Sequence, residues 1–128
     1  MIDLAARFAL LAQSDLVDLR LEAMTHDGCW RFHKDRVRLR LLATYCGPAT
    51  QIVAAEHAAQ ALRQQRAYDG PIEALSNGDV ALFKGDHAEP GSGVVHRSPP
   101  VQGTGAARLL LCPELPSAAS PPEFGSAD

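Results

Sequence analysis

The hydrophobic pattern of the chain changes its period within the first 24 residues. In residues 2–13 the large apolar side chains Leu4, Phe8 and Leu11 recur at helical spacing among alanines, which predicts a short amphipathic helix. From residue 17 onward the period is two, with Val17, Leu19, Leu21 and Ala23 on one side and Asp18, Arg20, Glu22 and Met24 on the other. This alternation predicts a strand with one buried face and one face in water.

A second alternation lies in residues 29–50, which read CWRFHKDRVRLRLLATYCGPAT. Aliphatic residues at 37, 39 and 41 alternate with arginines at 36, 38 and 40, so we predict a strand whose arginines face solvent and which ends at Gly47 and Pro48. If strand geometry extends back toward residue 33, His33 and Asp35 point to the same side as the aliphatic residues. Burial of two polar side chains is costly unless they are paired, so this conflict between pattern and polarity indicates a functional site.

The rest of the chain predicts one surface helix and several short strands. Residues 54–66 are rich in Ala, Gln and Arg and favour a surface helix. Short β-type segments follow turns at 80–83, 94–96 and 108–111. Strands of this length and spacing indicate an antiparallel sandwich or barrel. Residues 113–128 are rich in proline and serine, so we expect a disordered tail there and a single domain over residues 1–112.

Composition and charge narrow the class of protein further. A chain of 128 residues with 46% hydrophobic and 21% charged residues is typical of one soluble globular domain. The formal net charge of −3 argues against a nucleic-acid partner, which usually requires a basic surface. The three cysteines are an odd number without a secretory leader before them, so we expect a reducing cytoplasm. No apolar run approaches the roughly 20 residues of a membrane span, so we expect no membrane partner.

His33, Asp35 and His96 are the candidate metal ligands. Two imidazoles and one carboxylate form the ligand set of the facial triad, which holds Fe(II) and leaves coordination positions open for substrate and oxygen. In an extended chain, residues 33 and 35 project to one side with Cα atoms about 7 Å apart, so their side chains can converge on one ion. The third ligand has to come from another strand. A lone H-x-D motif is common, and the alternative is a set of ordinary hydrogen bonds at a sheet edge.

Cys29 and the two residues after His96 extend this candidate site. Cys29 precedes His33 by four positions, a spacing that suits zinc, and a thiolate ligand favours Zn(II) over Fe(II); the alternative is a small buried side chain. A Ser-Pro-Pro run ends the strand of His96, because proline cannot donate to a ladder, and this places His96 at a strand end or barrel mouth. Arg97 and Ser98 are candidate contacts to an anionic small molecule, although Arg97 could instead pair with surface acids.

The order of these features resembles the cupin and 2-oxoglutarate-dependent oxygenase superfamily. The H-x-D at 33–35, the strand GDVALF at 78–83 and the distal His96 carry the resemblance, together with Arg108 twelve positions later. The resemblance implies a mainly β (α+β) fold, a double-stranded β-helix or cupin-like barrel with a short N-terminal helix and a helical excursion near residues 54–66. It also implies that Arg108 grips a carboxylate of the co-substrate 2-oxoglutarate; the alternative is an arginine that faces outward.

A closer resemblance is to a bacterial family of unknown function, domain of unknown function 1826. The blocks that carry it are residues 29–50, GDVALFKG, GVVHRSPP and RLLLC, and together they cover roughly residues 15–112. The resemblance implies a genomic neighbourhood of zinc-responsive genes and CobW-type GTPases. Ala49 and Gln51 depart from the Gly and Glu usual in the family, so a ligand or base role of that Glu would be impaired here.

These features lead to one expected function and two alternatives. We expect a metal-dependent, dioxygenase-like protein that uses Fe(II), with or without 2-oxoglutarate, on an unknown small molecule. The first alternative is a non-catalytic Zn(II)-binding accessory protein in bacterial metal homeostasis. The second is a barrel that binds a ligand or partner without metal. Open sheet edges would also permit a homodimer, although nothing in the sequence specifies an interface.

Overall fold

The computed structural model describes residues 2–117 and residue 120. Within them lie the helices α1 (Ile2–Ala12) and α2 (Ala55–Gln64), the second followed by a 3-10 turn, η1 (Gln65–Ala67). The strands, in chain order, are β1 (Asp18–Met24), β2 (Leu39–Cys46), β3 (Gln51–Val53), β4 (Glu73–Ala74), β5 (Val80–Lys84), β6 (Val95–Arg97) and β7 (Arg108–Glu114). No helix in this part of the chain is long and apolar enough to cross a membrane.

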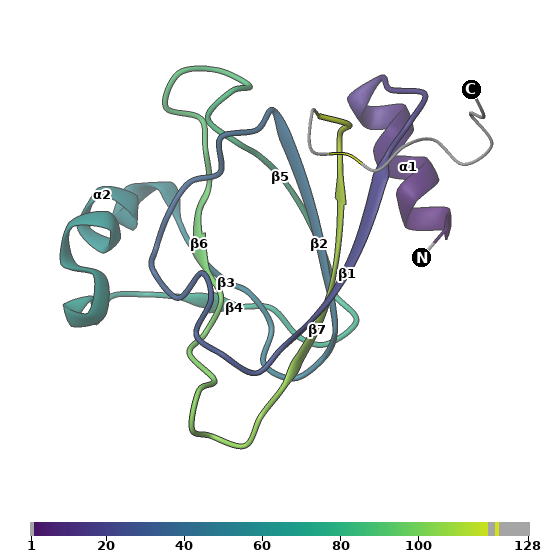
Figure 1. Ribbon diagram of the computed structural model, residues 1–128. Helices are drawn as coiled ribbons and strands as arrows, with labels where there is room; N and C mark the ends of the chain where they lie inside the picture. The colour runs from purple at the N-terminus through teal and green to yellow at the C-terminus, as the bar shows by residue number, and fades with distance from the viewer. Residues whose placement is uncertain (1, 118–119, 121–128) are drawn as a thin grey trace.

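The strands form two antiparallel sheets that face each other (Figure 1). The larger sheet has the order β1-β7-β2-β5 and the smaller sheet has the order β4-β3-β6. Every neighbouring pair of strands is antiparallel. α1 lies on the outer side of the larger sheet and α2 on the outer side of the smaller one. The expectation of a mainly β, α+β fold is therefore confirmed.

The space between the two sheets is filled largely by apolar side chains. Because side chains alternate along a strand, every second residue of β2, β5 and β7 points inward. These inward residues form a buried cluster that packs against side chains of the opposite wall: Leu42, Ala81, Phe83, Leu110 and Cys112, with Ile52, Leu75 and Val94. This cluster positions the inner faces of the two sheets relative to each other, and the polar site described below lies beside it.

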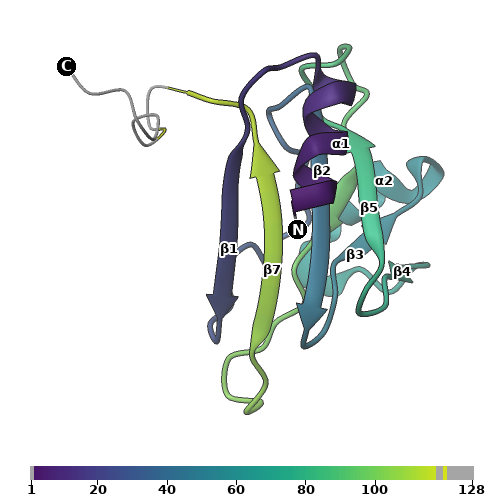
Figure 2. The ribbon, with the colours of Figure 1, turned by 90° about the vertical axis from the view of Figure 1, so that its right-hand side faces the viewer.

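Each helix is fixed to its sheet by a narrow apolar stripe. In α1, Phe8 and Ala12 are four residues apart and share one helix face, where both are buried against Leu41 of β2. Figure 2 shows α1 lying over β2. Leu11, which the sequence pattern placed on this face, is exposed. α2 packs on the smaller sheet through a second buried cluster: Phe32, Val53, Ala61, Tyr68 and Val95. Both helices expected from the sequence are confirmed.

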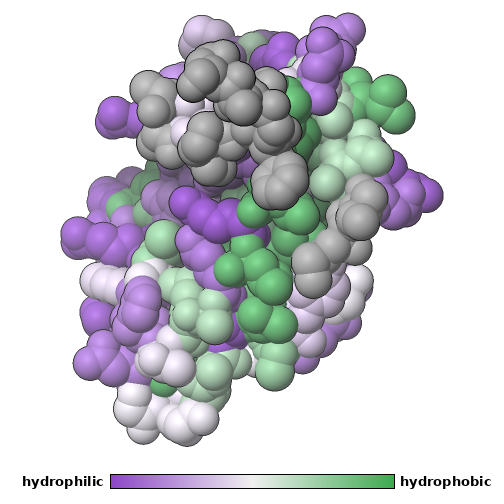
Figure 3. All heavy atoms as spheres, turned by 45° about the vertical axis from the view of Figure 1, so that its right-hand side comes forward, coloured by the Kyte–Doolittle hydropathy of each residue, from purple (hydrophilic) through white to green (hydrophobic). Residues whose placement is uncertain are grey.

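The strand expected after residue 17 is confirmed as β1, but its two faces are reversed relative to the prediction. Met24 is buried, and Arg20 and Glu22 on the same face line a cavity between the sheets. Leu19 and Leu21 on the opposite face are 47% and 46% exposed. Figure 3 shows hydrophobic residues gathered on this outer side of the molecule. The polar side of β1 therefore faces the interior, and the apolar side faces outward.

The strand expected within residues 29–50 begins later than its alternation suggested. β2 starts at Leu39, and His33 and Asp35 lie in the loop before it. The interpretation of these two residues as members of an aliphatic row is therefore wrong. The solvent-facing role expected for Arg40 is wrong as well, because Arg40 shares the inner face of β2 with Leu42 and its side chain is 13% exposed.

The short strands expected near residues 80, 94 and 108 are confirmed as β5, β6 and β7. β7 extends two residues past the expected domain end, because Pro113 and Glu114 pair with Leu19 and Asp18 of β1. Most of the expected tail, residues 118–119 and 121–128, lies outside the described residues. The pairing defines two sheets, and a closed double-stranded β-helix does not follow from it.

Candidate metal centre

The side chains of His33, Asp35 and His96 meet in the space between the two sheets. Each offers one ligand atom, and these atoms all lie within 4.8 Å of one another. His33 and Asp35 come from the loop that precedes β2, and His96 is the central residue of β6. The fold thus brings together all three residues that the sequence marked as candidate ligands.

Backbone hydrogen bonds hold the loop of His33 and Asp35 in place. The His33 amide donates to the His96 carbonyl at 3.0 Å, and the His96 amide donates to the His33 carbonyl at 3.1 Å, which forms an isolated bridge. The Asp35 carbonyl accepts an amide hydrogen from the chain just beyond β5 at 2.9 Å. Gly85 permits this close approach, because a Cβ atom there would lie 2.0 Å from the carbonyl oxygen of Val37.

Asp35 is the centre of a charged network. Its Oδ1 lies 3.3 Å from Nε2 of His33, and its Oδ2 lies 3.3 Å from Nε2 of His96. Arg40 on β2 donates from Nε to the same Oδ2 at 2.8 Å. Nη1 of Arg40 donates in turn to Oε1 of Glu114 on β7 at 3.1 Å. The carboxylate of Asp35 is therefore held by a guanidinium that is itself fixed between two strands.

Both imidazoles are oriented through their second nitrogen. Nδ1 of His33 lies 2.7 Å from the carbonyl oxygen of Arg31, and Nδ1 of His96 lies 2.9 Å from that of Val94. A carbonyl oxygen only accepts, so Nδ1 carries a hydrogen in each ring. Nε2 donates to Asp35 when the ring is protonated, and it presents a lone pair to a metal when the ring is neutral. Metal-binding histidines are commonly oriented by such a hydrogen bond from the ring nitrogen that does not bind the metal.

The surroundings of Asp35 favour its ionised form. Burial alone raises the pKa of Asp35, but the hydrogen bonds from His33 and His96 and the charges of His96 and Arg40 outweigh burial and hold this pKa well below its usual range. The hydrogen bond to Asp35 raises the pKa of His33 against the opposing effect of burial. Burial lowers the pKa of Arg40, yet the charges of Cys112 and Asp35 outweigh it and raise that pKa overall. The cluster thus offers an anion to a cation.

The donor set fits a divalent transition metal. Ligand atoms about 2.1 Å from a metal and about 90–110° apart around it are about 3.0–3.4 Å from each other. Nε2 of His33 lies 3.3 Å from Oδ1 of Asp35 and Nε2 of His96 lies 3.3 Å from Oδ2, so each of these two separations falls within this range. With one ligand atom taken from each residue, the three atoms lie within 4.8 Å of one another. Two imidazoles and one carboxylate suit Fe(II) and Zn(II), and three ligands leave coordination positions for other molecules. The side-chain chemistry of the cluster therefore suits such an ion.

A cavity of about 120 Å³ contains the cluster. Toward the β1 end that holds Arg20, its lining carries paired charges: Arg20 lies 2.8 Å from Glu22 and 3.3 Å from Glu114. The lining also includes the apolar residues Met24, Leu42 and Leu110 and the polar residues Thr50 and Ser98. The cavity is thus lined by charged, polar and apolar side chains and carries the candidate ligands in its wall.

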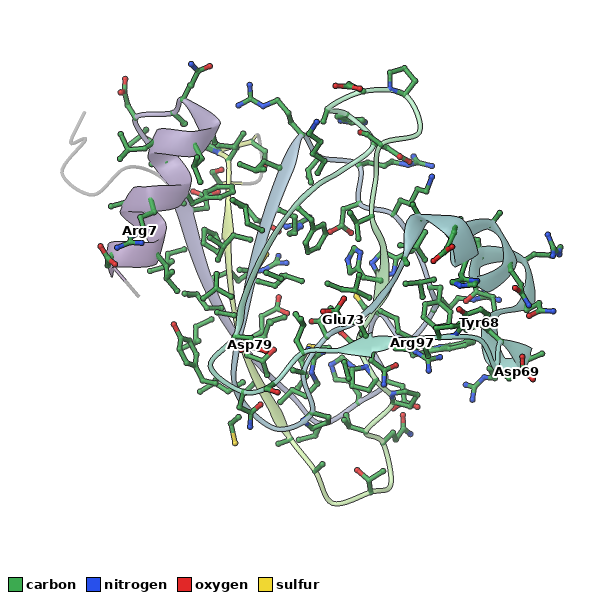
Figure 4. All side chains as sticks on the ribbon, turned by 180° about the vertical axis from the view of Figure 1, so that it is seen from behind. Arg7, Tyr68, Asp69, Glu73, Asp79 and Arg97 are labelled. Carbon is green, nitrogen blue, oxygen red and sulfur yellow. The ribbon has the colours of Figure 1, made fainter. Side chains whose placement is uncertain are left out.

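Two of the other residues that the sequence marked, Cys29 and Ser98, line this cavity. Cys29 lies outside the group of three close donor atoms, and its carbonyl accepts from the Ser98 amide at 2.9 Å. Arg97 follows His96 on β6 and points to the opposite face of the smaller sheet. Figure 4 shows Arg97 with Tyr68 on the side of α2, away from α1. The structure therefore does not bring Arg97 to the cavity.

The two positions that the resemblance marked as departures, Ala49 and Gln51, lie outside the cluster. Gln51 is on β3 beside Arg97, and its Oε1 accepts from Nε of that arginine at 2.8 Å. Ala49 is buried before β3. Neither side chain belongs to the close donor group, so the candidate ligand set is intact in this chain.

Arg108 is buried beside the cavity and is 1% exposed. Its Nε donates to the carbonyl of Pro48 at 2.7 Å, and its Nη2 donates to Oγ1 of Thr50 at 3.3 Å. Nη1 has no hydrogen-bond partner among the described residues. Burial lowers the pKa of Arg108. The alternative of an outward-facing arginine is therefore wrong, and a buried donor is left free next to a residue of the cavity wall, where an unpaired donor is costly.

Sequence reasoning missed Arg40, Cys112 and Glu114 as parts of the site. Arg40 was assigned to solvent because it alternates with aliphatic residues, and Glu114 was assigned to the tail. Cys112 is buried, and its Sγ accepts from Nη1 of Arg40 at 3.1 Å. The available signal was the carboxylate of Asp35, which needs a cationic partner if it is buried.

The fold and the cluster together define a small antiparallel β protein with a candidate metal centre between its sheets. The chain belongs to the family described as "Protein of unknown function (DUF1826)", which matches residues 1–113. No curated protein matches the sequence. Among solved structures, the chain is similar to the crystal structure of AviO1 from Streptomyces viridochromogenes Tue57, with 20% sequence identity over 94% of this chain and a TM-score of 0.46. The chain spans 59% of the AviO1 chain.

Proposed function

We propose that the chain binds a divalent metal through His33, Asp35 and His96 and acts as an Fe(II)-dependent oxygenase on a small molecule. The observation that carries this proposal is the convergence of two imidazoles and one ionised carboxylate within 4.8 Å. The backbone carbonyls that orient both rings support it, because they leave Nε2 of each ring available to a metal. Iron(II), when bound, supplies the capacity to bind and activate oxygen.

The chain's own residues have distinct parts in this proposal. Arg40 positions the Asp35 carboxylate through the hydrogen bond to Oδ2. Arg108 offers its free Nη1, and Thr50 a hydroxyl in the cavity wall, to a carboxylate such as that of 2-oxoglutarate. Ser98 lines the same cavity and is a further hydrogen-bonding group for a substrate. Arg97, on the other face of β6, has no part in the inner site.

We also propose that the two sheets are the halves of a cupin-like double-stranded β-helix. Two facing antiparallel sheets with a site between them support this assignment, as does the bridge that joins His33 to β6. In such a barrel the amides of His33 and His96 should exchange slowly with solvent deuterium. Exchange as fast as that of an open loop at both amides would contradict it.

Metal content is the first test. The chain, stripped with a chelator and reloaded with Fe(II) or Zn(II) in the absence of oxygen, should bind one equivalent of metal, measured by elemental analysis after dialysis. His33→Ala and Asp35→Asn should abolish this binding. His87→Ala, which removes an exposed imidazole outside the cluster, is the matched control and should bind normally. A wild-type chain that retains no metal would overturn the proposal.

Turnover is the second test. The Fe(II)-loaded chain with 2-oxoglutarate and oxygen should form succinate, and His33→Ala should not. Arg108→Lys keeps the charge but loses the planar fork, so it should raise KM for 2-oxoglutarate more than it lowers kcat. One equivalent of zinc without succinate would instead support the accessory role in metal homeostasis. In that case Cys29→Ser should weaken zinc binding if the Cys29 thiolate is a fourth ligand.

A further inference from the structure

Trp30, the one tryptophan in the chain, carries two arginine side chains on its ring. The guanidinium carbon of Arg66 lies 4.0 Å from the ring centroid, and that of Arg31 lies 5.2 Å from it. Arg97 is held in the same way, with its guanidinium carbon 4.2 Å from the ring centroid of Phe32. Stacking on an aromatic face fixes the orientation of a guanidinium while its N–H edge stays available for hydrogen bonds.

These three arginines form no ion pair with a carboxylate in the part of the chain that the structure describes. Burial and the nearby charge of Arg66 lower the pKa of Arg97, so the like charges are close enough to repel. One acid, Asp27, lies near these three arginines: its Oδ1 accepts from the amides of Val101 and Gln102 at 2.8 and 2.7 Å, and its charge also interacts with that of Arg66. The cluster therefore carries positive charge in excess of its partners.

A pocket of about 370 Å³ lies beside this cluster. Its lining residues are Asp27, Cys29, Trp30, Arg31 and His33. Cys29 and His33 also line the inner cavity, so the two spaces share part of a wall. The outer pocket is large enough for a small organic molecule. A molecule bound in the outer pocket would lie next to one of the candidate metal ligands.

We propose that this outer pocket binds the oxyanion of a small organic anion, a carboxylate or a phosphate, at the N–H edge of Arg31, with the charge of Arg66 on the same indole ring adding to the attraction. A guanidinium recognises such groups through two parallel hydrogen bonds, and the excess positive charge of the cluster attracts them. The role of this anion as the substrate rests on the proposed function, because its body would approach the metal from the side of His33. Binding of the anion itself requires no metal.

Trp30 makes this binding measurable, because its fluorescence is the only tryptophan signal of the chain. Phenyl phosphate and benzoate, titrated in the presence of EDTA, should each give a saturable change in emission, and benzyl alcohol, which is neutral, should not. The anion with the lower Kd identifies whether a phosphate or a carboxylate is preferred. Arg31→Gln and Arg66→Gln should each raise Kd about tenfold, which corresponds to about 1.4 kcal/mol. Calorimetric titration gives the same constants independently of the tryptophan environment.

Arg7→Gln is the matched control, because Arg7 is an exposed arginine of α1 on the opposite side of the molecule (Figure 4). It should leave Kd unchanged. The proposal fails if neither anion binds, if benzyl alcohol binds as tightly, or if Arg7→Gln weakens binding as much as Arg66→Gln. It also fails if single-stranded RNA displaces phenyl phosphate at far lower concentration, since a nucleic acid would then be the ligand. Loss of metal binding with anion binding intact would refute the proposed function and leave this inference standing.

Discussion

At the edge strand β1 and at Arg40 of β2, the inner and outer faces of the larger sheet have the reverse of the polarity expected from burial. The inner face carries Arg20, Glu22 and Arg40, although it faces the interior. The outer face carries Leu19 and Leu21, which are about half exposed. A polar row on a strand usually indicates a face in water, and here it indicates the wall of a cavity. The comparison teaches that alternation located β1 correctly but did not tell which side of the strand is inside.

The two faces also differ in how they are stabilised. The inner charges are paired with one another, as Arg40 is with Asp35 and Glu114, so their desolvation is offset by hydrogen bonds. The outer face is stabilised by apolar burial where α1 covers it, and Phe8 is completely buried there. Substitutions on the two faces should therefore differ in size and in what they change: stability alone on the outer face, and stability together with metal binding on the inner one.

The largest effect is expected under α1. Phe8→Ala should lower the free energy of unfolding by about 3–5 kcal/mol, because it removes a fully buried aromatic side chain and leaves a cavity. Urea-induced unfolding followed by circular dichroism measures this change. Leu11→Ala on the same helix is the control and should cost well under 1 kcal/mol by comparison, since Leu11 is exposed. Equal losses in the two variants would show that α1 does not pack through Phe8.

Arg40→Met should have the next largest effect, and it tests the inner face. We expect the free energy of unfolding to fall by about 2–3 kcal/mol, because Asp35 and Glu114 are left without their shared cation. This is somewhat less than for a completely buried ion pair, since the Arg40 side chain is 13% exposed. Metal affinity should fall as well, since the Asp35 carboxylate is no longer held. Chemical denaturation and a zinc titration measure the two changes.

The double variant Asp35→Asn with Arg40→Met distinguishes a paired network from independent contacts. If the two side chains are coupled, the double variant should lose clearly less stability than the sum of the two single variants. A strictly additive result would mean that Arg40 stabilises the fold without acting through Asp35.

Much of the secondary structure could be predicted from the sequence, because it depends on local patterns. The spacing of Phe8 in α1, the alternation in β1 and the turn before β5 all placed elements correctly. The choice of inner face could not be predicted, because it depends on which sheet a strand meets. Residues 33–35 show the same limit: the pattern continued a strand through them, whereas the structure holds them in a loop through pairing with His96, which is distant in sequence.

The candidate ligands could be predicted and their supports could not. His and Asp are polar residue types that are seldom found in an apolar pattern without a specific partner, so the sequence alone identified His33, Asp35 and His96 as candidate metal ligands. Arg40 belongs to a residue type that is normally exposed, and its contact with Glu114 joins two strands that are separated by more than 60 residues. This contact depends on β7 lying beside β2 in the larger sheet, and that strand order cannot be read from the local sequence.

Leu21→Ser should have a small effect on the free energy of unfolding, and it tests the outer face of the larger sheet. Leu21 is half exposed at the edge strand β1, so its replacement should cost about 1 kcal/mol or less. Metal binding should be unchanged, because Leu21 points away from the cavity. Thermal unfolding and metal titration of the same sample check both points. A large loss of stability would mean that this face is covered in solution.

Asp27→Asn should have the smallest effect and concerns pH. The hydrogen bond from the Gln102 amide lowers the pKa of Asp27, against the opposing effect of burial. A carboxyl whose pKa is lower in the folded state adds stability above its unfolded pKa of about 3.9, and this stability is lost as pH falls through the folded value. The wild-type Tm should therefore drop more steeply below about pH 4 than that of Asp27→Asn. The difference between the two curves isolates the contribution of Asp27 from that of the other carboxyls.

At pH 7 the same variant also tests the outer pocket. If Asp27 mainly fixes the loop at Val101, the affinity for the anion should change little. A marked gain in anion affinity would show that Asp27 neutralises Arg66.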